Sequence, residues 1–209
     1  MLKAIIFDFD GTIADSEGLM IEIVNQYSKK YKYRQIDYGE INSLKGRPLR
    51  EVIPTFKIPF FMMPFLIRDV LNRFGERSKE IKIFSGVEAL INRLSEKGYD
   101  LYIVSSNKKE NIEKFLKNNR VNVFKSVYSS FNIFGKDRLI NKLLKNEKLS
   151  LDECIYVGDE VRDIDACRKV GLKIVSVTWG YNVDSALKKF NPDFVIDNTE
   201  DLYNTLSCL

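Results

Sequence analysis

The 209-residue chain contains no histidine. Histidine is the usual general base of serine and cysteine nucleophilic sites, and it is a common metal ligand. Its absence excludes such sites here. Any catalytic chemistry must therefore depend on carboxylates, lysine, hydroxyl groups and backbone amides.

Cysteines and long apolar runs are also scarce. The three cysteines form no CxxC pair, so we expect neither a disulfide framework nor a zinc knuckle. No apolar run approaches the roughly 18–20 residues that a membrane-spanning helix needs. The stretch Leu2–Phe7 is short for a signal peptide and runs directly into acids. We therefore interpret it as a first strand and expect a cytoplasmic protein without membrane contact.

The charge of one segment stands out against an otherwise balanced chain. The net charge of +4 is too small to indicate nucleic-acid binding. The whole excess lies between Asp15 and Lys82, where 13 basic residues accompany 9 acidic ones. Either a solvated helical surface or the attraction of anionic substrates would account for it.

Short apolar runs alternate along the chain with amphipathic stretches that end at glycine or begin at polar residues. This alternation predicts a doubly wound, parallel α/β sheet. The expected strands are residues 3–8, 100–105, 123–128, 154–158, 173–177 and 193–196. The expected helices are residues 87–97, 108–118, 136–145 and 163–170, with a last helix from residue 199.

The segment from residue 15 to residue 82 breaks this alternation. A helical pattern covers 19–31, and four prolines interrupt the rest of the segment. We interpret residues 15–82 as a helical cap inserted into a core of residues 1–14 and 83–209. The apolar run Ile58–Phe65 packs inside the cap in the simplest interpretation; a hydrophobic lid, a membrane contact or a partner surface is the alternative.

Three expected strands end in polar side chains, at Asp8, Ser105 and Asp159. Ligands of open α/β sheets bind beyond the carboxyl ends of the strands, near the point where the strand order reverses. The sequence therefore directs these three groups toward one edge of the sheet.

Asp8 and Asp10 follow the first strand, and Gly11 permits a sharp turn after them. An ordinary turn at the end of a strand would also explain these residues. Buried carboxylates are costly without a cation, however, and Mg²⁺ takes carboxylate oxygens as ligands. Asp8 could then attack a phosphate as nucleophile, while Asp10 protonates the leaving oxygen and later activates water.

Further polar residues fit the same site, although each has a plain structural explanation. Ser105 ends a strand, and the amides of Ser106 and Asn107 could hold phosphate oxygens, or Ser105 could simply cap a helix. Lys136 begins a helix, where its charge is unfavourable unless a buried anion pairs with it. Asp159 and Asp163 lie four residues apart, and Asp163 is also a favourable acid for the first turn of a helix.

Together these residues resemble the motifs of the haloacid dehalogenase superfamily, over nearly the whole chain. The matching residues are Phe7-Asp8-Phe9-Asp10-Gly11-Thr12, Ser105, Lys136 and Gly158-Asp159-x-x-x-Asp163. Four further stretches resemble the phosphoglycolate phosphatase-like branch: Ala14-Asp15-Ser16, Phe84-Ser85-Gly86-Val87, Phe134-Gly135-Lys136-Asp137 and Trp179-Gly180-Tyr181.

The resemblance implies a Rossmann-like, three-layer α/β/α core with a helical cap, and it implies a role for each matching residue. Asp8 would be nucleophile and Mg²⁺ ligand, and Asp10 would be acid/base and would touch Mg²⁺ through its carbonyl. Ser105 and Lys136 would hold the phosphate, and Asp159 would bind Mg²⁺ with Asp163 beside it. Additional phosphate contacts would come from Gly11, Thr12 and Ser106.

We expect an enzyme that hydrolyses a small phosphorylated metabolite, such as phosphoglycolate, as a monomer or homodimer. A sugar-phosphate mutase shares these motifs, and a non-catalytic binding module on this scaffold is a third possibility. Arg47 lies where similar caps place a substrate-facing loop, so it would either grip an anion or be an exposed arginine.

Overall fold

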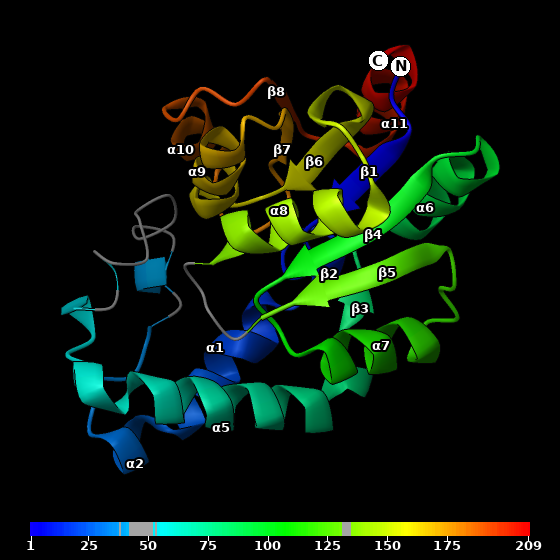
Figure 1. The fold of residues 1–209 in the computed structure, drawn as a ribbon. Coiled ribbons are helices and arrows are strands. Elements are labelled where there is room, and N and C mark those ends of the chain that lie inside the picture. The colour runs from blue at the N-terminus through cyan, green and yellow to red at the C-terminus, as the bar shows by residue number, and fades with distance from the viewer. Residues whose placement is uncertain (38, 42–51, 53, 131–134) are drawn as a thin grey trace.

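A sheet of six parallel strands forms the centre of the molecule (Figure 1). The computed structural model describes residues 1–37, 39–41, 52, 54–130 and 135–209. The strand order is β5-β4-β1-β6-β7-β8, as the alternation of strands and helices predicted for a doubly wound sheet. The strands are β1 (Ala4–Phe7), β4 (Asp100–Ser105), β5 (Phe124–Ser129), β6 (Cys154–Gly158), β7 (Ile174–Val177) and β8 (Phe194–Ile196).

Helices cover both faces of this sheet, which gives the three-layer α/β/α arrangement. Successive side chains of a strand point to opposite faces, so Ile5 and Phe7 of β1 pack into one apolar cluster, and Ala4 and Ile6 into the other. The first cluster takes in α6 (Val87–Glu96), α7 (Lys109–Asn118) and α11 (Thr199–Cys208). The second takes in α8 (Lys136–Glu147), α9 (Val161–Val170) and α10 (Asp184–Lys188).

β1 lies at the point where the order of strand addition reverses. Phe7, the last residue of β1, is in register with Ile103 of β4 and with Val157 of β6. The chain runs outward from β1 through β4 and β5, then returns to add β6, β7 and β8 on the other side. A crevice for ligands is therefore expected beyond the carboxyl ends of β1, β4 and β6.

The chain between β1 and β4 leaves the sheet core and returns to it through a short antiparallel ribbon. Its strands are β2 (Ala14–Asp15) and β3 (Lys82–Ile83), and Asp15 lies opposite Lys82. The helical elements with bounds between them are α1 (Glu17–Gln26), α2 (Ser28–Tyr31), η1 (Phe60–Met62), α5 (Met63–Glu76) and η2 (Ser78–Glu80), and residues 39–41, 52 and 54–55 are helical as well. We call residues 16–81 the inserted segment.

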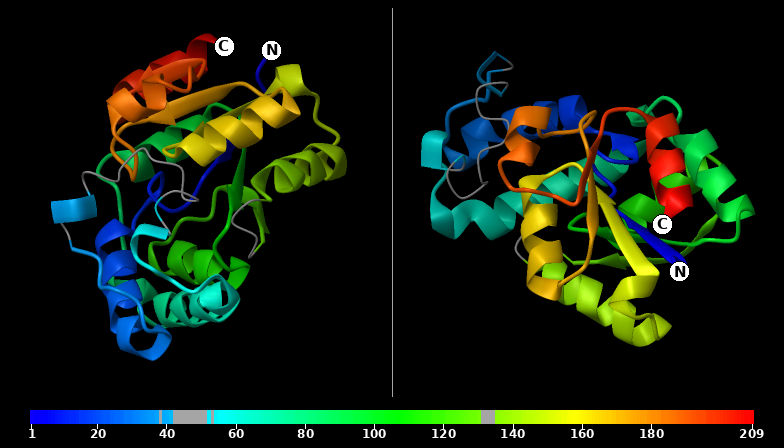
Figure 2. Two further views of the ribbon diagram at one scale, coloured as in Figure 1. Left: turned by 90° about the vertical axis from the view of Figure 1, so that its left-hand side faces the viewer. Right: turned by 90° about the horizontal axis from the view of Figure 1, so that it is seen from above.

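The longer helices of the inserted segment lie together on one side of the sheet. In Figure 1 this is the side toward which β4 and β5 point, and both views of Figure 2 keep α1, α2 and α5 at one end of the molecule.

Residues 19–31, expected as one helix, form two. The amide of Tyr27 bonds the carbonyl of Val24, a three-residue step that tightens the last turn of α1 before α2 begins.

Part of the apolar run Ile58–Phe65 packs against the core, and part is exposed to solvent. Ile58, Met62 and Met63 pack against the buried core, whereas the side chains of Phe61 and Phe65 are largely exposed. Across the described residues, no helix is long and apolar enough to span a membrane.

Candidate active site

Asp8 lies directly after β1, at the centre of the sheet edge. Its amide donates to the carbonyl of Val157, so strand pairing continues to this residue. Its side chain turns back, and Oδ1 accepts from the amide of Phe9 at 2.7 Å. Only 2% of Asp8 is exposed, which places an ionisable group in a nearly dry position.

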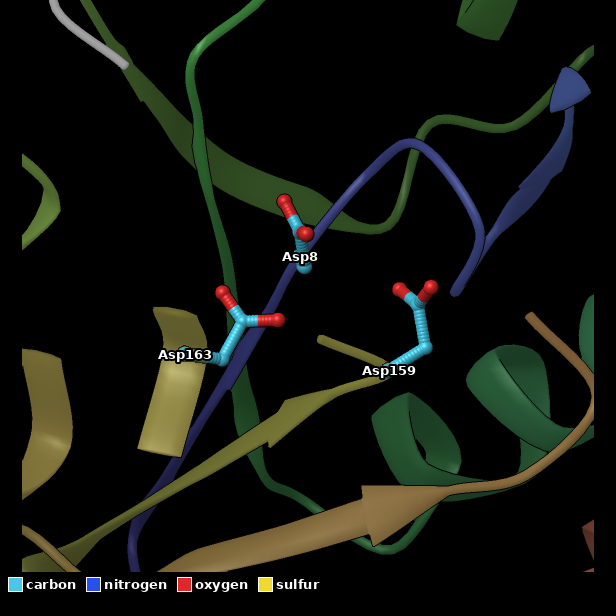
Figure 3. A group of neighbouring side chains, drawn as sticks. All are labelled: Asp8, Asp159 and Asp163. Carbon is cyan, nitrogen blue, oxygen red and sulfur yellow. The ribbon is translucent and has the colours of Figure 1, made fainter. Parts of the chain in front are cut away.

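Two further carboxylates reach the same place from neighbouring elements. Asp159 follows β6, and Asp163 lies in the first turn of α9; both are fully buried. Figure 3 shows these side chains beside that of Asp8. One oxygen from each of the three carboxylates lies within 4.8 Å of the others, which is close enough for a single cation to bind them together.

Lys136 supplies positive charge to this cluster from the first residue of α8. Its Nζ lies 2.9 Å from Asp8 Oδ2 and 2.5 Å from Asp163 Oδ1. These are the buried anionic partners that a lysine at a helix N-terminus requires. Asp163 also accepts from the amide of Glu160 at 3.0 Å, so both of its oxygens are engaged.

Burial raises the pKa of Asp8 to about 7, although the charge of Lys136 opposes the rise. Burial, together with the neighbouring carboxylates of Glu160 and Asp8, also raises the pKa of Asp159 well above its usual value. These shifts mean that one ammonium group does not compensate the negative charge of the cluster. A divalent cation would do so, and the all-oxygen donor set suits a hard ion such as Mg²⁺.

Asp159 is held in a narrow space between two glycines. A Cβ on Gly11 would come within 2.2 Å of Asp159 Oδ2, and one on Gly180 within 2.3 Å of the same atom. Its oxygens accept from the hydroxyl of Thr12 and from the amide of Tyr181, each at 2.7 Å. The carboxylate can therefore rotate little.

Asp10 is fixed by side chains from two different parts of the chain. Ser16 donates to its Oδ1 at 2.8 Å, and Asn107 donates to its Oδ2 at 2.9 Å. The hydroxyl of Tyr181 lies 2.8 Å from that of Ser16 and extends the network. Burial raises the pKa of Asp10, and the two hydrogen bonds oppose the rise.

The remaining residues expected at the site lie around the same strand ends. Ser105 ends β4 and is buried, and its Oγ accepts from the amide of Asn107 at 3.0 Å. Ser106 is partly exposed beside it. The structure places the Thr12 hydroxyl on Asp159, as described above. Arg47 lies outside the described residues.

Several residues of the network were not singled out for a role from the sequence. Ser16 donates to Asp10, and Tyr181 contacts the hydroxyl of Ser16. Glu160 forms a two-pronged ion pair with Arg162, with N–O distances of 2.8 and 2.5 Å. Each lies inside a motif that was noticed, either Ala14-Asp15-Ser16, Trp179-Gly180-Tyr181 or the residues between Asp159 and Asp163. For Tyr181 the motif was the only signal, because its contact with Ser16 spans 165 positions.

The chain is similar to curated phosphatases and pyrophosphatases over nearly its whole length. The chain is 32% identical over 209 residues to phosphoglycolate phosphatase of Synechococcus elongatus, covering 100% of this chain and 99% of the relative. It is 24% identical to pyrophosphatase PpaX of Anoxybacillus flavithermus, with 98% and 97% covered.

Among solved structures, one from Clostridium acetobutylicum, described as a predicted phosphatase, has the same fold. Its TM-score is 0.89 at 21% identity, with 100% of both chains covered. The model of the family described as haloacid dehalogenase-like hydrolase matches residues 5–177. That match spans most of the sheet and every carboxylate of the site, and the chain therefore belongs to the haloacid dehalogenase-like hydrolase family.

Proposed function

We propose that this protein is a Mg²⁺-dependent phosphatase that hydrolyses a small phosphomonoester through an aspartyl-phosphate at Asp8. The observation that carries the proposal is the position of Asp8. It is buried at the sheet edge, 2.9 Å from the ammonium of Lys136 and beside two further carboxylates. Nucleophile, charge compensation and cation ligands are thus gathered at one point.

The cation would be held by Asp8 and Asp159, by the backbone carbonyl of Asp10, and by Asp163 beside them. When bound, Mg²⁺ supplies positive charge that offsets the repulsion between a carboxylate and a phosphate dianion. The tight fit of Asp159 between Gly11 and Gly180 supports this assignment, because a fixed carboxylate suits the strict geometry that Mg²⁺ demands.

The first chemical step forms a bond between an Asp8 oxygen and phosphorus, and it breaks the bond from phosphorus to the leaving oxygen. Asp10 donates a proton to that oxygen, so the product leaves as an alcohol. In the second step water attacks phosphorus, Asp10 accepts its proton, and the acyl-phosphate bond breaks. Inorganic phosphate departs, and both Asp8 and Asp10 return to their starting states.

Other residues bind and orient the phosphoryl group. Lys136 and the hydroxyl of Ser105 stabilise its negative oxygens, and the amides near Gly11 and Ser106 add donors. Lys136 also contacts Asp163, which keeps the ammonium directed at Asp8. The pKa of Lys136 stays raised despite its burial, because Asp163 and Asp8 favour the charged form.

We further propose that residues 15–82 form a cap over a catalytic core of residues 1–14 and 83–209, and that this cap selects the leaving group. Its excess positive charge would attract an anionic substrate. Phosphoglycolate is the first substrate to test, since the relative at 32% identity bears that name.

The test is phosphate release from a panel of phosphoesters by the purified protein. We expect release that requires Mg²⁺, greatest on a small anionic phosphoester, and lost in Asp8→Asn. Asp165→Asn, an exposed carboxylate of α9, is the matched control and should keep the wild-type rate. Activity of Asp8→Asn at the wild-type rate would refute the covalent mechanism, and dependence on a bisphosphate activator would indicate a mutase.

A further inference from the structure

The inserted segment and the sheet core meet where α5 crosses α7, and polar side chains connect the two helices. Lys108 is the N-cap residue of α7, and Asn111 and Lys114 lie within the helix at three-residue spacing, which places these two on neighbouring positions of one face. Lys108 donates to the side chain of Asn72, Asn111 to the carbonyl of Leu71, and Lys114 to the carbonyl of Gly75.

Asn111 differs from the two lysines because it also points toward the active site. It is buried, and its Nδ2 lies 2.8 Å from the carbonyl oxygen of Leu71 and 3.0 Å from Oδ1 of Asn107. Both partners are acceptors, so the amide group of Asn111 can have only this orientation.

Asn107 continues the connection to Asp10. Its Oδ1 also accepts from the backbone amide of Lys108 at 2.8 Å, which fixes the side chain with its NH₂ group on the other side. That NH₂ group donates to Asp10 Oδ2 at 2.9 Å. An unbroken chain of directed hydrogen bonds thus runs from the backbone of α5 to the Asp10 carboxylate.

Gly75 makes this arrangement possible. A Cβ at residue 75 would lie 2.1 Å from Oδ1 of Asn111 and 2.9 Å from its Cγ. Since real Cβ atoms do not approach so closely, any larger residue would displace the Asn111 amide. The glycine lets α5 approach the side chain that binds it.

We infer that Asn111 is a positioning residue that couples the seating of α5 to the orientation of Asp10. When α5 is seated, Leu71 and Asn107 hold the Asn111 amide, and Asn107 is thereby held against Asp10. The inference rests on the proposed function, since it assigns to Asp10 the proton that the leaving oxygen receives.

This role predicts a dependence on the leaving group. An aryl oxide is a stable anion and leaves without a proton, whereas an alkyl oxide needs one. Disturbing Asp10 should therefore slow transfer from an alkyl phosphate far more than from an aryl phosphate. General acid catalysis contributes about 10²–10⁴-fold, so a misaligned acid can lose much of that factor.

The experiment compares kcat/KM for p-nitrophenyl phosphate and for phosphoglycolate, because kcat/KM reports the steps up to formation of the aspartyl-phosphate. Asn111→Leu removes the hydrogen bonds at nearly constant size, and Gly75→Ala displaces the amide from the α5 side. In both, we expect the ratio of aryl to alkyl kcat/KM to rise at least about tenfold. Lys114→Met, which removes another bond of the same helix pair, should leave the ratio unchanged.

An unchanged ratio in both Asn111→Leu and Gly75→Ala, with wild-type hydrolysis of both substrates, would overturn the inference and leave the proposed function intact. The same rise in Lys114→Met would also overturn it, because helix seating alone would then explain the effect. If the wild type hydrolyses no alkyl phosphate, the proposed function fails and this inference fails with it. Should Asn111→Leu not fold, Gly75→Ala decides, since it adds a methyl group and removes no hydrogen-bonding atom.

Discussion

Two buried carboxylates of this chain show opposite responses to their surroundings. Burial raises the pKa of Asp8 to about 7, although the charge of Lys136 opposes the change. Hydrogen bonds from Lys30 and then Tyr31 lower the pKa of Asp69 to about 2. Asp69 is therefore a stabilising anion within the inserted segment, whereas burial disfavours the charged form of Asp8, which a bound cation would stabilise.

The position of Asp69 predicts a pH-dependent contribution to stability. Its Oδ2 lies 2.5 Å from Lys30 Nζ and 2.7 Å from the hydroxyl of Tyr31. Asp69→Asn should lower the free energy of unfolding at neutral pH by about 1 kcal/mol, a modest value because Lys30 is 57% exposed and solvent screens the pair. Urea unfolding monitored by circular dichroism measures the difference.

The sign of the pH dependence follows from the lowered pKa. The contribution is complete above the unfolded pKa of about 3.9 and is lost as the pH falls through about 2. The gap between wild type and Asp69→Asn should therefore close in that range. A gap that stays constant to pH 2 would contradict the assignment. Asp184→Asn, which removes an exposed pair with Lys188, is the control and should change stability by less than about 0.5 kcal/mol.

Among the elements, the loop after β7 does more than connect β7 with α10. Trp179 Nε1 donates to the carbonyl of Thr12 at 3.1 Å, the amide of Tyr181 bonds Asp159, and the Tyr181 hydroxyl bonds Ser16. One short stretch thus contacts the turn after β1, a proposed metal ligand and the support of Asp10. Gly180 lets this stretch lie against Asp159.

Gly180→Ala tests the contribution of that loop. The added Cβ would lie 2.3 Å from both the Gly11 carbonyl oxygen and Asp159 Oδ2, so backbone or carboxylate must move. A displacement of about 1 Å can cost about 10²-fold in rate, and we expect a loss of that order together with weaker Mg²⁺ activation. Gly18→Ala, where a Cβ would meet no atom within 4 Å, should retain wild-type kinetics. Equal activity of the two variants would show that the loop has no such role.

Strand ends were predictable from the sequence, and the contacts between them were not. Asp8, Ser105 and Asp159 follow apolar runs, and carboxyl ends of parallel strands share one edge of a sheet, so local pattern suffices to bring them together. The partners of Asp10 could not be found in this way. Asn107 bonds it across 97 positions, and Tyr181 reaches Ser16 across 165, distances over which no periodicity carries information.

On the scale of the whole molecule, the insertion at residues 16–81 follows β1, the strand at which the order of strand addition reverses. The ribbon of β2 and β3 anchors both ends of the segment. The α/β class follows from the alternation of strands and helices, and the structure confirms it. The helix pattern of 19–31 missed the break at Tyr27, because a local tightening of one turn leaves the apolar spacing unchanged.

A buried acidic site also predicts that a cation stabilises the fold. A ligand at 100 times its Kd adds about 2.7 kcal/mol, which for a chain of this size raises Tm by roughly 5–10 °C. Mg²⁺ should raise the Tm of the wild type in a saturable manner, and Asp159→Asn should abolish the rise. Asp165→Asn should respond like the wild type. A wild-type Tm that is independent of Mg²⁺ would contradict the metal site.

The central claim is that phosphoryl transfer passes through Asp8, and trapping of the intermediate tests it most directly. Protein quenched with acid during turnover of phosphoglycolate and Mg²⁺ would be reduced with borohydride, which converts an acyl phosphate to an alcohol, and its peptides analysed by mass spectrometry. The account predicts homoserine at position 8. With p-nitrophenyl phosphate, whose leaving group needs no proton, Asp10→Asn should accumulate more of it, because water is no longer activated. Turnover without modification of Asp8, or modification at another residue, would contradict it.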